Sequence, residues 1–258
     1  MMRLLLNTLP TWGVILGMTL FSVFIGWLLY SLLRHFLPKF LINQEPHDAR
    51  ESMHLTSVLS ALLLTFMVVL LWQSYDILQQ NVVNEAKTIG RLEIFTESLP
   101  VDHDKKISGL LESYVNVLVN EEWPAMRLGQ SSPKASEILL ELRYAIEAID
   151  AKTPALSNYR HDMLQDYNDI VFARNLRLDH LGTTIPVFFL VTITVNLLGM
   201  FLLLCLLNPA SHKRSHFFFL ITTSAILGLN FSFLIVLDYP FSGELSINSA
   251  PLTYIHFD

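Results

Sequence analysis

The sequence predicts an all-α integral membrane protein with four transmembrane helices, arranged as two hairpins separated by a helical extramembrane insert. Two observations predict this class. The chain of 258 residues is 52% hydrophobic and only 16% charged, and it contains four apolar runs without a charged residue or a histidine. Each run is close to the roughly 20 residues that cross the hydrocarbon core of a bilayer. The runs are residues 12–33, 55–72, 185–207 and 217–237.

The four runs divide the chain into two hairpins, an insert and a tail. The insert lies between spans two and three, and we expect it to be continuous with both. The predicted parts are residues 1–75 (spans about 12–33 and 55–74), 76–182 (the insert), 183–238 (spans about 184–207 and 217–237) and 239–258 (the tail).

The helix of span two is predicted to continue beyond the membrane into the insert. No Gly or Pro interrupts it from Leu55 until Gly90. Residues spaced alternately four and three apart mark one packed face of a helix. One of them is an acid, Glu85, about 20 Å beyond Trp72 at the helical rise per residue. The face comprises Leu71, Tyr75, Leu78, Val82, Glu85, Ile89 and Leu92.

The insert is acidic, with 17 Asp or Glu against 11 Lys or Arg, so its charge of −6 equals that of the whole chain. Its apolar residues recur at helical spacing. We therefore predict four insert helices, the last running directly into span three. They are the extension of span two to about residue 98, and then about 103–122, 133–151 and 155–181.

Three residues are predicted to set the boundaries of these helices. Asp102 and Ser132 have side chains that can cap the second and third helices. Pro124 is expected to end the second helix, because proline lacks the N–H that a helix interior requires.

A candidate charge cluster lies near the predicted membrane boundary. The fourth insert helix has two alternative packed faces, one with Arg174 and Arg177 and one with Leu164, Val171 and Leu178. Either arginine is an expected partner for the acid that ends span four, since the helix dipole disfavours an anion there. A structural role, locking the insert to the membrane helices, is favoured over contact with a permeant ion. The cluster comprises Asp76, Glu85, Arg174, Arg177 and Asp238.

Small and polar residues within the spans indicate either contacts between membrane helices or the lining of a pore. Asn196 and Asn230 are expected to hydrogen-bond across helices, because an unsatisfied amide in hydrocarbon is costly; a polar pore lining is the alternative. Gly13 and Gly17 are four residues apart, a spacing of small residues that permits another helix to approach closely. Candidate pore-lining residues on span two and just beyond it are Ser57, Ser60, Thr65, Trp72, Ser74 and Tyr75.

Three short patterns resemble a bacterial membrane family that is described as bestrophin-like. They are Tyr75-Asp76 with Glu85-Ala86 after span two, Arg174-x-x-Arg177-Leu178 before span three, and Asp238-Tyr-Pro-Phe-Ser-Gly after span four. The last is the most specific, and its Pro240, Phe241 and Gly243 have the composition of a turn. The resemblance covers nearly the whole chain, from span one to the region of Gly243.

The resemblance implies a pore-forming homo-oligomer in a bacterial inner membrane. Bestrophins are pentameric anion channels with four membrane helices, and their second helix lines the pore. The acidic insert would instead gather cations, so the permeant ion stays open. The alternative function is a non-conducting sensor or assembly protein whose acidic insert binds a ligand or partner.

Other function classes lack their motifs in this sequence. There is no G-x-S-x-G, H-E-x-x-H or phosphate-binding glycine loop, so we predict neither an enzyme nor a cofactor. His212 and His216 are interpreted as a solvated pair at the membrane surface, so no metal site is predicted. No basic patch indicates nucleic acid. The expected partners are the lipid bilayer, permeant ions and further copies of the chain.

The charges of the two short connections between spans predict an orientation. They place the connections in the cytoplasm by the positive-inside rule, and hence the insert and both termini outside. The resemblance implies the opposite, a cytosolic helical region, and both orientations stay open. The charges counted are Arg34, Lys39, Arg50, Lys213 and Arg214.

Overall fold

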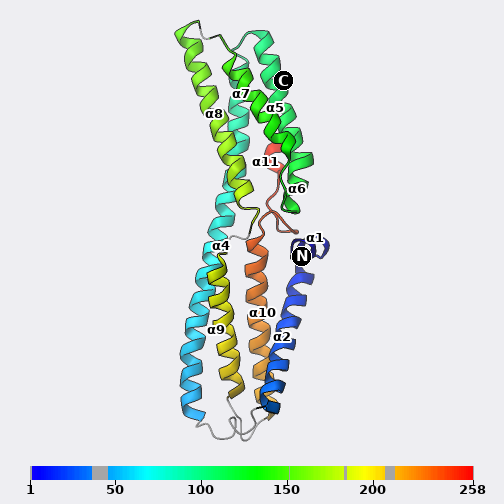
Figure 1. Cartoon of the computed structure of the whole chain (residues 1–258), viewed down its shortest axis with the longest axis vertical. Helices are drawn as coiled ribbons and strands as arrows, with labels where there is room; N and C mark the ends of the chain where they lie inside the picture. Colours follow the sequence, from blue (N-terminus) through cyan, green and yellow to red (C-terminus); the bar gives the residue numbers. More distant parts are fainter. Residues whose placement is uncertain (1, 37–45, 151, 183–184, 207–212, 258) are drawn as a thin grey trace. The chain divides into compact units, whose positions relative to one another are not determined.

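The structure is a computed structural model that describes all residues except 1, 37–45, 151, 183–184, 207–212 and 258 (Figure 1). Every regular element in this described part is a helix. The chain divides into two compact units. Unit 1 comprises Met1–Asn7, Ser74–Gly182 and Tyr239–Asp258, and unit 2 comprises Thr8–Gln73 and Thr183–Asp238.

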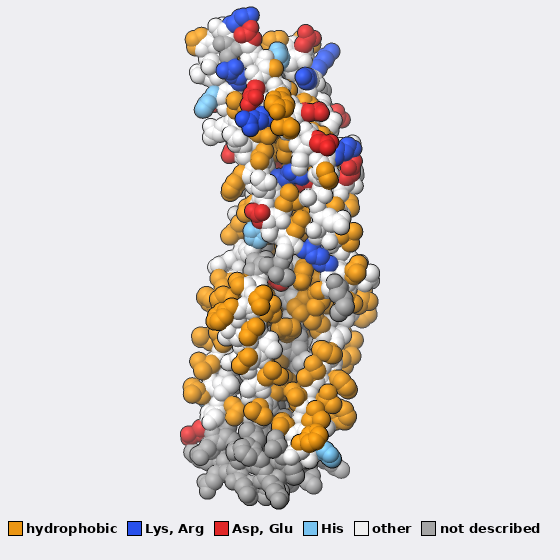
Figure 2. Space-filling view, viewed as in Figure 1, with side chains coloured by type: hydrophobic (Ala, Val, Ile, Leu, Met, Phe, Trp, Pro, Cys, Tyr) orange, Lys and Arg blue, Asp and Glu red, His pale blue; other side chains and the backbone are white. Residues whose placement is uncertain are grey.

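Unit 2 contains the apolar helices. It is formed by α2 (Thr11–Phe36), the first part of α4 (Pro46–Thr96), α9 (Val187–Leu206) and α10 (Lys213–Asp238). Over the described residues, α2, α4 and α10 are long and apolar enough to cross a membrane, whereas the apolar stretch of α9, Val187–Leu203, is shorter. Hydrophobic side chains cover the visible face of these helices (Figure 2).

Helices α2 and α10 pack closely through glycine and serine. A methyl group on Gly228 of α10 would lie 2.9 Å from Thr19 Cα of α2, and Ser22 Oγ donates a 2.9 Å hydrogen bond to Ser224 O. Within the described residues, Gly13 and Gly17 make no close approach to another helix, because a methyl group on Gly17 would meet nothing within 4 Å and one on Gly13 would meet Pro10. Gly13 and Gly17 lie on the opposite side of α2 from Ser22, nine and five residues away at 100° per residue.

Unit 1 contains the polar helices. The part of α4 that belongs to unit 1, from Ser74 onward, packs with α5 (Val101–Val117), α7 (Pro133–Glu147) and α8 (Pro154–Asp179) around one core. A π-helix, η1 (Leu118–Glu122), and α6 (Trp123–Arg127) follow α5, while α1 (Met2–Thr8) and α11 (Ala250–Thr253) come from the two ends of the chain. Charged side chains gather on the visible surface of this unit (Figure 2).

The sequence correctly predicted the buried face of α4, and the structure decides between the two alternative faces of α8. On α4, the residues of the predicted face from Leu78 to Leu92 are at most 1% exposed. On α8, the face with Arg174 and Arg177 is the buried one, whereas Leu164, Val171 and Leu178 of the alternative face are only partly buried and pack at the edge of the core.

Two predicted helix boundaries differ in the structure. Pro124 lies at the start of α6 instead of ending a helix, because the wider turn of η1 precedes it, with Trp123 N–H bonded to Leu118 O, five residues back. Such a turn relieves the i−4 constraint that proline violates. Asp102 lies inside the first turn of α5, whose N-cap is Pro100. Ser132 is the N-cap of α7 but makes no side-chain capping bond.

The expected continuity of the fourth insert helix with span three is also absent. Helix α8 ends at Asp179 and α9 begins at Val187. Pro186 explains where α9 begins, because proline disfavours a helical conformation in the residue before it and suits a first turn. Phe189 N–H donates to Pro186 O at 2.9 Å, which is the first turn of α9.

Candidate functional site

Four buried charged residues meet in the core of unit 1, and we call them the charge cluster. They are Glu85 on α4, Glu122 on η1, and Arg174 and Arg177 on α8. Each is at most 6% exposed. Buried charges are tolerated only when they are paired and hydrogen-bonded, so the geometry of these pairs decides what the cluster can do.

Arg177 pairs with Glu85. Its Nε and Nη2 atoms each donate a 2.8 Å hydrogen bond to the carboxylate, one to each oxygen. Tyr114 OH donates to the same carboxylate at 3.1 Å. The Arg177 guanidinium also lies 4.8 Å from the ring centroid of Trp123, at cation–π distance. These contacts tie α8, α4, α5 and α6 together.

Arg174 pairs with Glu122. Its Nε atom donates to both carboxylate oxygens at 3.0 and 3.1 Å, and Nη2 donates to Oε2 at 2.6 Å. Its remaining hydrogen bonds go to α7 and its N-cap, at Ser136 Oγ (3.0 Å) and Ser132 O (3.1 Å). Ser132 N–H completes this part of the cluster by donating to Glu122 Oε2 at 3.3 Å.

Burial and neighbouring charges shift two pKa values at the charge cluster, those of Arg177 and Tyr114. Burial opposes the charge on Arg177, but the charge of Glu85 and the hydrogen bond to it outweigh burial and raise the pKa of Arg177. Burial raises the pKa of Tyr114 well above its ordinary value, and the Glu85 charge adds to this rise. Arg177 thus keeps its charge, and Tyr114 stays a hydrogen-bond donor.

Glu122 was missed by the sequence reasoning. It stood two residues before Pro124, where a helix end was expected, and an acid at a helix end is ordinarily solvated. Its signal was the spacing of Leu111, Val115, Leu118 and Glu122, which continues the packed face of α5. The π-helix keeps this face buried as far as Glu122.

Two other predicted members lie elsewhere. Asp76 is exposed on α4 and accepts a 2.8 Å hydrogen bond from Gln80. Asp238 belongs to unit 2, where its Oδ1 accepts a 3.0 Å hydrogen bond from Ile185 N–H. Arg174 and Arg177, its expected partners, pair with Glu122 and Glu85 in unit 1.

The C-terminal motif forms a turn that packs beside the charge cluster. Ser242 N–H donates to Tyr239 O at 3.0 Å, and Ile247 N–H donates to Pro240 O at 2.8 Å. Phe241 is buried edge-on against Trp123, the ring that lies over Arg177. Gly243 has a φ of +84°, in the left-handed region that favours glycine.

A cavity of about 390 Å³ in unit 2 is lined by part of the predicted pore-lining set. Ser57, Ser60 and Thr65 of α4 face it, together with Asn230 of α10. Ser60 is buried and lies at hydrogen-bond distance from Asn196 of α9. The interhelical bond expected of Asn196 is therefore present, whereas Asn230 bonds to Ile226 O of its own helix at 2.9 Å.

The other predicted pore-lining residues lie apart from this cavity. Trp72 is 58% exposed. Ser74 and Tyr75 belong to unit 1 and are half-buried. Tyr75 OH donates to Leu245 O at 3.0 Å, so this side chain fastens the C-terminal segment to α4.

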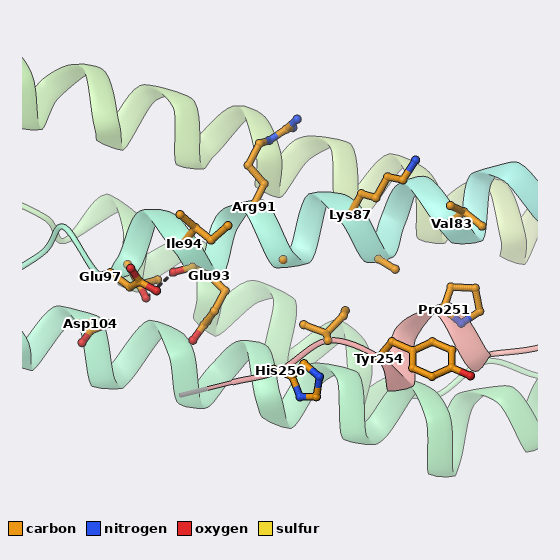
Figure 3. Close-up of a pocket in the computed structure, with 14 residues that line it drawn as sticks. Val83, Lys87, Arg91, Glu93, Ile94, Glu97, Asp104, Pro251, Tyr254 and His256 are labelled. Atoms are coloured by element: carbon orange, nitrogen blue, oxygen red, sulfur yellow. Dashed lines mark hydrogen bonds between the residues drawn. The ribbon is translucent and has the colours of Figure 1, made fainter.

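Unit 1 also has a groove of about 670 Å³ that the sequence did not reveal (Figure 3). Ala86 and Gly90 of α4 and Tyr254 and His256 of the C-terminal segment are among the residues that line it. A methyl group on Gly90 would meet nothing within 4 Å. Lys87 and Arg91 point away from Tyr254 and His256 (Figure 3). The groove joins α4 to a segment more than 150 residues away in sequence.

Comparison with known proteins identifies the fold and the family. No functionally curated protein matches the chain. Two crystal structures of a bacterial bestrophin homologue from Klebsiella pneumoniae, each with a single substitution, are similar to it, with TM-scores of 0.65 and 0.62 and identities of 13% and 15%. Each alignment covers 93% of this chain and 96% of the homologue. The bestrophin-like domain description matches residues 20–252. The chain therefore belongs to the bestrophin-like family.

Proposed function

We propose that the protein is a pore-forming homo-oligomer of a bacterial inner membrane, with α4 lining the conduction path. The single observation that carries this proposal is the bestrophin-like family membership over residues 20–252. Helix α4 supports it, because 51 residues run without interruption from an apolar stretch into polar unit 1. A pentamer is the assembly that the resemblance implies.

Within α4, the residues proposed to face the path are Ser57 and Thr65. Both line the 390 Å³ cavity, and both carry a hydroxyl group in the mainly apolar stretch of α4 between residues 55 and 72. Ser60 has a different role in this proposal, since it is 3% exposed and contacts Asn196. It holds α4 against α9.

The charge cluster is proposed to be structural. Its two arginines and two glutamates are paired and almost completely buried, which favours a role in holding helices together over contact with an ion in transit. Asp76, exposed on α4, remains a candidate for contact with ions at the mouth of the path.

Ion flux into vesicles tests this proposal. The purified protein, reconstituted and checked for assembly, is expected to pass monovalent ions down a gradient. Potassium chloride, potassium gluconate and N-methylglucamine chloride separate cation from anion movement. An assembled protein that gives no flux in any of these salts would show that the proposal is wrong.

Cysteine modification tests the lining separately. With Cys205→Ser as background, Thr65→Cys is expected to lose flux on treatment with a charged thiol reagent. The matched control is Phe66→Cys, the neighbouring position, which is 56% exposed and does not line the cavity. If modification blocks flux only at Phe66, the pore proposal stands but its lining is on the other face of α4.

The groove of unit 1 favours a second candidate, a non-conducting sensor or assembly protein. It is about 670 Å³ in volume, a size typical of ligand sites. Crosslinking in native membranes separates the two functions. Monomers or dimers favour the sensor, and a closed ring favours the channel.

A further inference from the structure

The short helix α1 is attached to unit 1 by one of its two faces. Arg3 Nη1 donates to Met126 O at 3.2 Å, and its guanidinium lies 5.3 Å from the ring centroid of Tyr239. One helical turn later, Asn7 Nδ2 donates to Arg127 O and Asn7 Oδ1 accepts from Gly243 N–H, both at 2.9 Å. Because α1 is fixed at both ends, its orientation on unit 1 is set.

The attached face of α1 packs closely against a surface that we call its seat, formed by Met126–Gly129 and the turn at Gly243. Leu6, between the two polar anchors, is 4% exposed. Gly129 and Gly243 both have positive φ, and a methyl group on Gly129 would lie 2.7 Å from Arg3 Nη1. A methyl group on Gly243 would lie 3.3 Å from Leu6 O. Glycine is therefore favoured at both positions of the seat, Gly129 and Gly243, where α1 approaches closely.

The opposite face of α1 is apolar and exposed. Leu4 and Leu5 are 59% and 41% exposed, and Leu9, directly after the helix, is 44% exposed. Scattered exposed leucines need no explanation. Here, however, two adjacent leucines are held outward by a helix whose other face is fixed.

Chain continuity places this apolar face near the bilayer. Helix α2 begins at Thr11, and Thr11–Leu33 is long and apolar enough to cross a membrane. Only Leu9 and Pro10 lie between Thr8 and Thr11, and the three steps from Thr8 to Thr11 span at most about 11 Å even when fully extended. Trp12, at the start of α2, is 70% exposed and suits the membrane interface.

We propose that α1 is an interfacial helix whose Leu4 and Leu5 insert into the boundary between lipid headgroups and acyl chains. Helices that lie in this boundary bury one apolar face in it and keep a polar face outside. The polar face of α1 instead contacts the rest of unit 1, through hydrogen bonds of Arg3 and Asn7. Helix α1 thus fastens the Met126–Gly129 segment and the C-terminal turn to the bilayer surface, whether or not the protein conducts.

Spin labelling of the full chain tests whether Leu5 lies in the bilayer. A nitroxide is attached at Leu5→Cys in a Cys205→Ser background, and the protein is reconstituted in phosphatidylcholine–phosphatidylglycerol vesicles. Collision with oxygen, which concentrates in the bilayer, is compared with collision with a water-soluble nickel chelate. The matched control is Leu140→Cys on α7, a leucine that is 49% exposed in unit 1.

The expected result is an oxygen-to-nickel collision ratio at position 5 several times that at position 140. A ratio equal to that at position 140 would overturn the proposal, because α1 would face water. Low collision with both reagents would also overturn it, because a second copy or another protein would then cover α1. Leu4→Cys repeats the measurement if the first variant does not assemble.

Discussion

Arg177 on α8 holds both carboxylate oxygens of Glu85 on α4, through two hydrogen bonds of 2.8 Å, and neither side chain is exposed to solvent. The pair joins residues that are 92 positions apart. Arg177 Nη1 lies 3.6 Å from Glu122 Oε1, so the second pair of the charge cluster is in electrostatic contact with the first. Loss of one charge therefore leaves a buried partner without its counter-ion.

Arg177→Met is expected to destabilise the protein strongly. Removing one partner of a buried ion pair leaves an uncompensated charge and costs about 3–5 kcal/mol. Thermal unfolding of the detergent-solubilised protein measures the loss. Arg143→Met is the control, because Arg143 pairs with Glu147 on the exposed face of α7 and its removal should change little. Equal effects of the two substitutions would contradict the importance assigned to the charge cluster.

The pairing within the charge cluster predicts which substitutions interact. Glu85→Leu combined with Arg177→Met should cost less than the sum of the two single effects, by a coupling of about 0.5–3 kcal/mol. Glu85→Leu combined with Arg174→Met should be closer to additive, because Arg174 bonds to Glu122. A double-mutant cycle on unfolding temperature measures both couplings. A larger coupling for Glu85 with Arg174 would reverse the assigned pairs.

We expect Tyr114 to make the free energy of unfolding fall at alkaline pH. Burial raises its pKa well above the ordinary value of 10.0, so the unfolded chain releases this proton at a lower pH than the folded protein does. Below pH 10 the contribution to stability is complete, and it is lost as the pH rises from about 10 toward the folded pKa. While only the unfolded state has released the proton, the loss is about 1.4 kcal/mol per pH unit.

Tyr114→Phe should therefore reduce the alkaline slope of stability. Denaturant unfolding at several pH values between 9 and 11 measures this slope. Tyr144→Phe is the matched control, since Tyr144 is 60% exposed and its loss should leave the slope unchanged. An identical slope in both variants would mean that Tyr114 does not carry the effect.

Periodicity made the buried faces predictable, because a packed helix must place its apolar residues three and four apart. This is why the sequence identified the Glu85 face of α4, and offered the Arg177 face of α8 as one of two alternatives, without knowledge of their partners. Periodicity does not say which acid meets which base. Glu122 and Arg174 are brought together by the packing of η1 against α8, and η1 departs from the regular helix on which the sequence argument depended.

Features that depend on contacts between distant segments could also not be predicted from the sequence. The seat of α1 joins Asn7 to Gly243 across 236 positions, and no local pattern encodes such a pairing. The glycines that pack α2 against α10 were missed for a related reason. Small-residue spacing occurs at both Gly13–Gly17 and Ser22–Gly26, and only the position of α10 decides between them.

The orientation of unit 1 is predicted by charge to be extracytoplasmic. The five side chains behind this prediction lie outside the part of the chain whose side chains the structure describes; they are those of Arg34, Lys39, Arg50, Lys213 and Arg214. Tyr144→Cys in a Cys205→Ser background should react with a membrane-impermeant maleimide in spheroplasts. Reaction only after membrane lysis would place unit 1 in the cytoplasm, as the family resemblance implies.

Gly243→Ala should destabilise the protein by about 1–2 kcal/mol, the cost of a left-handed conformation for a residue with a Cβ. The φ of +84° and the 3.3 Å approach to Leu6 O both act against the added methyl group. Gly90→Ala is the matched control, because Gly90 lies inside α4, six residues before its end, and the added methyl group would meet nothing within 4 Å. That substitution should be neutral or stabilising by up to about 1 kcal/mol, since alanine favours helix over glycine. The unfolding temperature should therefore fall for Gly243→Ala and stay equal or rise for Gly90→Ala. Equal shifts in the two variants would contradict the close contact assigned between Gly243 and α1.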